Sequence, residues 1–287
     1  MSIRSLLFPA LLAIGITGHA AAATPLELEV FNPGEAAIFP VASVLIKGKH
    51  DAILVDAQFS RAEALKLSER IRASGKHLTT IYVSHSDPDF YFGLDVLQAA
   101  FPDAEIVATE QTVAAMHKKA DAKLAYWGPI LKDNAPQRIV YPQVLKGKTL
   151  TLEGHTLAVS GPNPARSYLW IPSIKAVVGG VVVFNDLHVW MADTQSAEAR
   201  KDWLATLDGI AALHPSTVVP GHFMPGAPLS PASVGYTRDY LTKFVDAAAK
   251  AANSGALIDT MQAQYPAAGM KGGLQTSAKV ATGEISW

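Results

Sequence analysis

Short apolar segments alternate with amphipathic segments along this chain, and that order constrains the fold more than any other feature. In the first half, the predicted strands lie at residues 44–46, 52–56, 80–83 and 106–108. The predicted helices lie at residues 60–75, 94–101 and 111–119. Ser60 and Glu63 have the spacing of a capping box at the start of the first of these helices. Strands that alternate with helices in this way are typical of a layered α/β protein.

The second half of the chain repeats the same order. Its predicted strands lie at residues 149–152, 155–159, 167–171, 175–184 and 217–219. Its predicted helices lie at residues 196–213 and from Ser230 onward, where Pro231 suits the first helical position. Residues 126–143 are rich in Pro, Asp and Asn and are predicted to be a loop. We find no internal repeat and no linker, so we predict a single domain over residues 24–287.

The first 23 residues have the features of a secretory signal. Arg4 precedes a mostly apolar run from Leu6 to about Ile16, which is too short to cross a bilayer, and small residues follow at 20–23. The alternative, an N-terminal helix of the fold, would need polar residues on one face of that run. We therefore expect cleavage after Ala22 or Ala23, a periplasmic or secreted protein, and no membrane insertion of the mature chain.

Composition excludes several classes of function. The chain has no cysteine, which excludes thiolate catalysis and every cysteine-ligated zinc or iron–sulfur site. It has 24 Lys and Arg residues against 25 Asp and Glu residues, a formal net charge of -1. Such a chain has no general electrostatic attraction for nucleic acid, so we expect no nucleic-acid partner. Any bound metal must be held by His, Asp, Glu or backbone oxygens.

A polar segment with metal-binding side chains follows the predicted strand 80–83. It reads H-x-D-x-D-F over residues 85–90 and precedes a glycine and a predicted helix. The segment resembles the H-x-H-x-D-H signature of the metallo-β-lactamase superfamily. An earlier strand that ends in Asp56 and a later P-G-H segment that ends in His222 resemble that family in the same order. The resemblance covers nearly all of residues 24–287 and implies a four-layer αβ/βα sandwich, an α/β fold.

The same resemblance implies a centre of two metal ions, usually zinc, that activates water for attack on an ester, thioester, lactam or phosphoester. Three residues match the family's ligands: His85, Asp89 and His222. Asp87 stands where a histidine is usual and can still coordinate through oxygen. Three further ligand positions carry apolar residues: Phe90, Pro162 and Val181. This ligand set argues against an ordinary dinuclear centre.

Two other histidines are candidates for replacement ligands. His155 stands in a G-H-T sequence, but it lies within the predicted strand pair 149–159 instead of at a strand end, so we reject it. His188 follows the strand that carries a bridging carboxylate in the family and is a candidate extra ligand. A loop histidine bonded to backbone is the equally weighted alternative. By position, the other candidates for a pocket wall are Asn163, Phe90, Tyr91 and Trp190.

The remaining donor set suits one divalent ion. Two imidazoles and two carboxylates, from His85, Asp87, Asp89 and His222, can bind zinc, or manganese or iron, with little discrimination. A single ion with an open position can still activate water. Asp89 and Asp87 are then candidate catalytic residues, as ligands and as proton acceptors. The alternative is a hydrogen-bonded network without metal.

These observations leave two main functions open, and the sequence favours the first over the second. The first is an exported metal-dependent hydrolase with an altered, mononuclear site that acts on an ester, thioester, lactone or phosphoester. The second is a non-catalytic protein that binds a small molecule, in which apolar residues have replaced the dinuclear centre. A weaker third function is a partner-binding adaptor that uses residues 126–143. In the first two cases the partner is a small-molecule substrate or ligand, and the oligomeric state is open.

Overall fold

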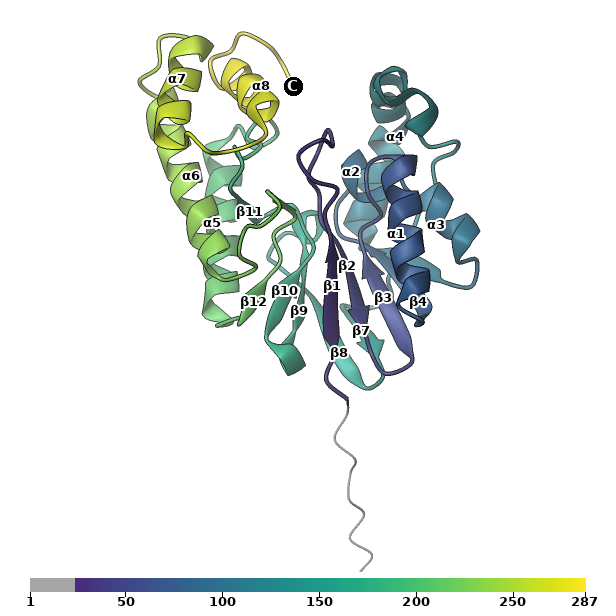
Figure 1. Ribbon diagram of the computed structural model, residues 1–287. Helices are drawn as coiled ribbons and strands as arrows, with labels where there is room; N and C mark the ends of the chain where they lie inside the picture. Colours follow the sequence, from purple (N-terminus) through teal and green to yellow (C-terminus); the bar gives the residue numbers. More distant parts are fainter. Residues whose placement is uncertain (1–23) are drawn as a thin grey trace, which may run out of the picture.

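Two β-sheets pack face to face, and helices cover the outer face of each sheet (Figure 1). The computed structural model describes residues 24–287, so the predicted signal at residues 1–23 lies outside the described residues. The layers follow the order helix, sheet, sheet, helix, which is the four-layer αβ/βα sandwich implied by the sequence. No helix within residues 24–287 is long and apolar enough to cross a membrane.

The first sheet has six strands in sequence order, β1-β2-β3-β4-β5-β6. The strands are β1 (Glu27–Phe31), β2 (Ser43–Lys47), β3 (Asp51–Val55), β4 (His77–Val83), β5 (Glu105–Ala108) and β6 (Gln143–Val144). β1 to β3 are antiparallel neighbours, whereas β3 to β6 are parallel neighbours. Parallel neighbours need crossover connections, which helices supply here. These helices are α1 (Arg61–Ala73), α2 (Pro88–Tyr91), α3 (Leu94–Ala100) and α4 (Glu110–Leu131).

The second sheet has five strands in the order β12-β10-β9-β8-β7, and a separate parallel pair joins β11 to β13. The strands are β7 (Thr149–Leu152), β8 (His155–Ser160), β9 (Tyr168–Ile171), β10 (Ala176–Val178), β11 (Phe184–Asn185), β12 (Thr217–Val218) and β13 (His222–Phe223). The helices of this half are α5 (Ala197–Ala212), α6 (Ala232–Ala248), α7 (Ser254–Gln264) and α8 (Lys271–Ala281). Short 3-10 helices are η1 (Lys132–Asn134), η2 (Pro164–Arg166) and η3 (Pro172–Ile174).

The central strands are buried on both faces, which explains their continuous apolar sequences. In β3, Ile53 and Val55 belong to the core between the sheets, whereas Ala52 and Leu54 belong to the core beneath the helices. Successive side chains of a strand point to opposite faces, so both faces of β3 must be apolar. The predicted capping box is present at the start of α1, where Glu63 N donates to Ser60 Oγ at 3.2 Å and Ser60 N donates to Glu63 Oε2 at 3.0 Å.

Helix α4 is longer than the helix predicted from the sequence pattern. It covers residues 110–131, so the predicted helix 111–119 is too short and the predicted loop 126–143 begins too early. The reason is a continuous apolar stripe at helical spacing, formed by Met116, Ala120, Leu124, Trp127 and Leu131. Pro129 lies in the last turn of the helix, so the hydrogen bond that its missing N–H removes is lost near the helix end and not in its interior. The Pro- and Asn-rich composition therefore marks only the residues after 131 as loop.

The predicted strand 175–184 is interrupted by two glycines. β10 ends at Val178, and Gly179 and Gly180 have φ angles of 73° and 83°. A Cβ on Gly180 would lie 2.4 Å from the carbonyl oxygen of Ser167, so the backbones approach too closely for any other residue. The chain leaves the sheet there, and its next strand, β11, pairs with β13 beside the cleft described below.

Candidate functional site

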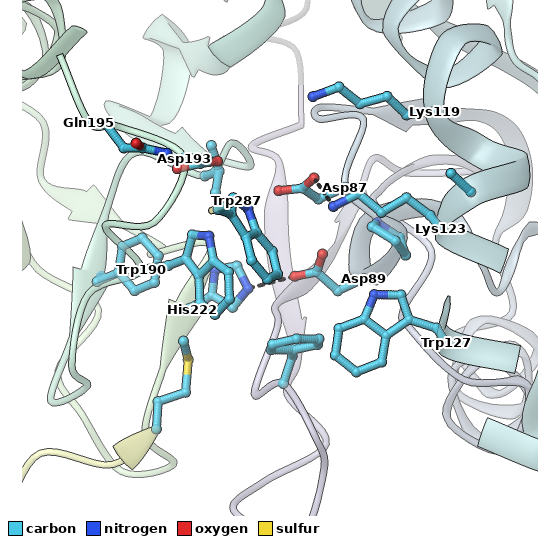
Figure 2. Close-up of a pocket in the computed structure, with 16 residues that line it drawn as sticks. Asp87, Asp89, Lys119, Lys123, Trp127, Trp190, Asp193, Gln195, His222 and Trp287 are labelled. Atoms are coloured by element: carbon cyan, nitrogen blue, oxygen red, sulfur yellow. Dashed lines mark hydrogen bonds and ion pairs between the residues drawn. The ribbon is translucent and has the colours of Figure 1, made fainter. Parts of the chain in front are cut away.

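A cleft of about 480 Å³ opens between α4 and the segments on either side of α8 (Figure 2). Five of its lining residues are aromatic: Phe39, Trp127, Phe184, Trp190 and Trp287. Seven are polar or charged: Asp87, Asp89, Lys119, Lys123, Asp193, Gln195 and His222. The cleft therefore combines apolar walls with a few convergent polar groups, which is the usual composition of a small-molecule site.

Asp89 and His222 form a direct hydrogen bond at the cleft. His222 Nε2 lies 2.7 Å from Asp89 Oδ2, and both side chains are buried (Figure 2). Asp89 comes from α2 and His222 begins β13, so residues 133 positions apart in the sequence meet here. The imidazole also stacks on Phe184, with ring centroids 4.9 Å apart. Of the two ring nitrogens of His222, Nε2 is hydrogen-bonded to Asp89. The other, Nδ1, is buried and has no hydrogen-bond partner among the described residues.

Asp87 lies in a separate cluster of charged groups. Its Oδ1 lies 3.5 Å from Lys123 Nζ and its Oδ2 lies 3.5 Å from His85 Nδ1. The backbone N–H of Asp87 also donates to His85 Nδ1 at 3.2 Å. Burial raises the pKa of the Asp87 carboxyl, but His85, Lys123, Arg166 and Lys119 together hold that pKa below its usual value. Burial lowers the pKa of His85, which favours the neutral imidazole.

Phe90 contacts one histidine of each cluster. Its ring centroid lies 5.5 Å from the ring centroids of both His85 and His222, in edge-on contact with each, and its side chain is fully buried. Within residues 24–287, no three His, Asp or Glu side chains converge closely enough to hold a metal ion. The four expected ligands form two pairs, Asp89 with His222 and His85 with Asp87. The residues present therefore do not fit a metal centre.

The other predicted pocket residues have different positions. Trp190 lines the cleft. Tyr91 is buried, and its hydroxyl has no partner among the described residues. Asn163 is exposed and accepts a hydrogen bond from the N–H of Ala165 at 3.0 Å, which caps η2. The structure thus brings only one of these three to the cleft wall.

His188 also lies outside the cleft wall. It is fully buried, and its Nδ1 lies 3.0 Å from the hydroxyl of Tyr240 on α6. Burial lowers the pKa of His188 to about 4, so the imidazole is neutral at ordinary pH. Its backbone N–H donates to the carbonyl of Gly269 at 3.0 Å. His188 therefore joins the β11 segment to the C-terminal helices.

Several cleft residues, among them Lys119 and Lys123, were not predicted from the sequence. Lys119, Lys123 and Trp127 lie on α4 at intervals of four residues, which places them on one face of a helix. This spacing would have predicted a shared helix face if the helix had been predicted to extend beyond residue 119. Met270 and Trp287 lie on either side of α8, a helix that the sequence analysis did not predict, and no local pattern connects them to the cleft.

Asp56 is a structural residue that holds the segment at residues 84–90 in place through hydrogen bonds to Ser84. It is fully buried, and the two oxygens of its carboxyl group accept hydrogen bonds from Ser84 N and Ser84 Oγ, each at 2.7 Å. Ser84 Oγ in turn accepts a hydrogen bond from Gly180 N at 2.8 Å. Asp56 thereby ties the end of β3 to the segment that carries His85 and to the glycine pair.

We expect Asp56→Asn to change the pH dependence of stability. Burial raises the pKa of Asp56 to about 8, against an ordinary value of 3.8, so the folded protein keeps a proton that the unfolded chain releases. The free energy of unfolding should therefore fall as pH rises from about 4 to about 8. Asparagine does not titrate, so the variant should lose this contribution. Urea unfolding of both proteins across this range measures it, and parallel curves would contradict the prediction.

Comparisons with known proteins agree with this architecture. The sequence profile of the metallo-beta-lactamase superfamily matches residues 37–222. A metallo-beta-lactamase family protein from Thermus thermophilus has a similar structure, with a TM-score of 0.63, 17% identity, and coverage of 90% of this chain and 91% of that one. A metallo-beta-lactamase from Pontibacter korlensis has a TM-score of 0.57 at 17% identity, covering 75% of this chain and 99% of that one. No curated protein matches the sequence.

The fold, the order of the motifs and the matched profile define the class of this protein. The chain belongs to the metallo-β-lactamase superfamily. Members of this superfamily generally bind divalent metals, typically zinc, and membership is consistent with a metal-dependent hydrolase. At 17% identity the structural neighbours define the fold alone, so the function of this chain has to be argued from its own cleft.

Proposed function

We propose that this protein binds a small organic molecule in the cleft without a bound metal ion. The observation that carries the proposal is Phe90, whose ring contacts both His85 and His222 and stands at the superfamily's fourth motif-ligand position, where no three donors converge among the described residues. The superfamily's metal-binding segment thus keeps its place in the fold but divides its donors between two pairs. Lys123 Nζ lies 3.5 Å from Asp87 Oδ1, so this carboxylate already has a cationic partner.

The composition of the cleft supports the same proposal. A volume of about 480 Å³ falls within the range of pockets that enclose drug-sized ligands. Val181, at the position of a bridging carboxylate in the superfamily, contributes an apolar side chain to the wall. Trp127 and Trp190 offer large flat surfaces on opposite sides of the cleft (Figure 2). We also propose, from the N-terminal sequence, that the protein acts in the periplasm or outside the cell.

A mononuclear metal-dependent hydrolase is the second candidate. The observation that favours it is the contact between Asp89 and His222, two residues at matching ligand positions that the fold brings within 2.7 Å. Such an enzyme would act on an ester, thioester, lactone or phosphoester and would hold one divalent ion, most simply zinc. It needs at least one further ligand, and among the described residues none lies close enough to complete the set.

Elemental analysis of the purified protein distinguishes the two candidates. The protein is dialysed against chelator, incubated with zinc, manganese or iron, desalted and measured by ICP-MS beside Asp89→Ala and His222→Ala. We expect metal contents well below one ion per chain in all three proteins. About one ion per chain in the natural protein, lost in both variants, would overturn the metal-free proposal and establish the mononuclear hydrolase as the better candidate.

A further inference from the structure

We infer that the ligand of the cleft is an amphiphilic monoanion, a molecule with a flat apolar body and one carboxylate or sulfonate group. This inference rests on the proposed binding function and adds the chemical class of the ligand. It depends on three features of the cleft: which charged groups already have partners, where the apolar walls lie, and which exposed apolar residues belong to the lining or adjoin it in the sequence.

The carboxylates of the cleft already have partners. Asp87 faces Lys123 at 3.5 Å, and Asp89 accepts a hydrogen bond from His222 at 2.7 Å. The third, Asp193, faces the guanidinium of Arg166 at 3.7 Å.

Lys119 is the cleft cation left without an ion-pair partner among the described residues. It is exposed and lies near enough to Asp87 to lower the pKa of that carboxyl, but it forms no direct ion pair. Figure 2 shows its side chain extending from α4 at the rim of the cleft, above Lys123. The group available to a ligand is therefore a cation, which an anionic group complements.

The walls below Lys119 are apolar and flat. Trp127 on α4 contacts Phe39, with ring centroids 5.4 Å apart. On the opposite side Trp190 contacts Trp287, with ring centroids 5.0 Å apart. Val181 and Phe184 complete this part of the lining. An aromatic or branched apolar body fits between such walls, because indole rings bury large areas at little cost in conformational entropy.

Several exposed apolar side chains belong to the cleft lining or lie next to it in the sequence. Large exposed apolar residues that belong to the cleft lining or lie within three positions of it are Ile38, Tyr126, Ile130, Ile285 and Trp287. Tyr126 also contacts Trp127 directly, with ring centroids 4.9 Å apart. The half-exposed Trp287 in the lining matches a ligand whose apolar part extends toward solvent.

The test compares two probes that share one apolar body. One is 1-anilinonaphthalene-8-sulfonate, a monoanion, and the other is N-phenyl-1-naphthylamine, which lacks the sulfonate. Both are titrated by fluorescence into the natural protein, Lys119→Met and Lys118→Met. Lys118 is the matched control, because it is an exposed lysine on the same helix that does not line the cleft. Trp190→Leu tests whether the apolar body lies between the walls, and near-UV circular dichroism verifies that each variant is folded.

We expect the natural protein to bind the anionic probe more tightly than the neutral one. Lys119→Met should weaken the anionic probe about fivefold, leave the neutral probe unchanged, and differ from Lys118→Met. Trp190→Leu should weaken both probes. Equal affinity for both probes, or equal effects of the two lysine variants, would overturn the anionic ligand while leaving the binding function intact. Failure of both probes to bind the folded protein would overturn the proposed function as well.

Discussion

The double variant Phe90→His, Val181→Asp is expected to bind zinc at least about 100-fold more tightly than the natural protein. The reason is the placement of donors already in the fold. Asp89 and His222 lie in contact at the cleft, Val181 lines the same cleft, and Phe90 lies in edge-on contact with His222. The two substitutions therefore add an imidazole and a carboxylate beside an existing pair, which gives the four ligands that zinc prefers.

Competition with a chromophoric chelator measures the zinc affinity of the natural protein and the variants. The matched control is Phe90→His, Val181→Asn, because asparagine has nearly the shape of aspartate but is a poor zinc ligand. The control should gain much less affinity than the double variant. If the natural protein already binds zinc as tightly as the double variant, Phe90 and Val181 are not what excludes the metal, and the metal-free proposal is wrong.

Gly221→Ala is expected to destabilise the protein by about 3 kcal/mol. A Cβ at this position would lie 2.0 Å from the carbonyl oxygen of Gly180, so one of the two backbones must move. Gly221 also donates its N–H to Val183 O at 3.0 Å and accepts from Ala42 N at 2.8 Å, and both hydrogen bonds would be strained by that movement. Because His222 is the next residue, its contact with Asp89 should be lost at the same time.

Urea unfolding of the variant measures this loss, and Gly235→Ala is the matched control. Gly235 is exposed on α6, and nothing lies within 4 Å of a Cβ built there. Alanine favours a helix more than glycine does, so the control should gain up to about 1 kcal/mol. A Gly221→Ala protein as stable as the natural one would show that the two backbones can separate without cost, and that this glycine does not fix the position of His222.

The layers of the fold could be predicted because they depend on local periodicity. A strand buried on both faces must be apolar at each buried position, as in β3. The start of an amphipathic helix such as α1 can be predicted from the capping residues in its sequence. The order of these elements, together with the motif segments, was enough to identify the family. The errors arose where composition conflicted with packing. The Pro-rich region after Tyr126 still continues α4, because its apolar stripe packs against the core.

The sequence alone determined which side chains were available to the site: no cysteine, three of the family's ligands, and apolar residues at three other ligand positions. It could not determine how they pair, because partners such as Asp89 and His222 are 133 residues apart and meet only when the sheets pack. The tertiary structure decided that Phe90 contacts a histidine of each pair and that Lys123 forms an ion pair with Asp87. It also brought Trp287 to the cleft through α8, since such long-range contacts depend on the packing of whole elements.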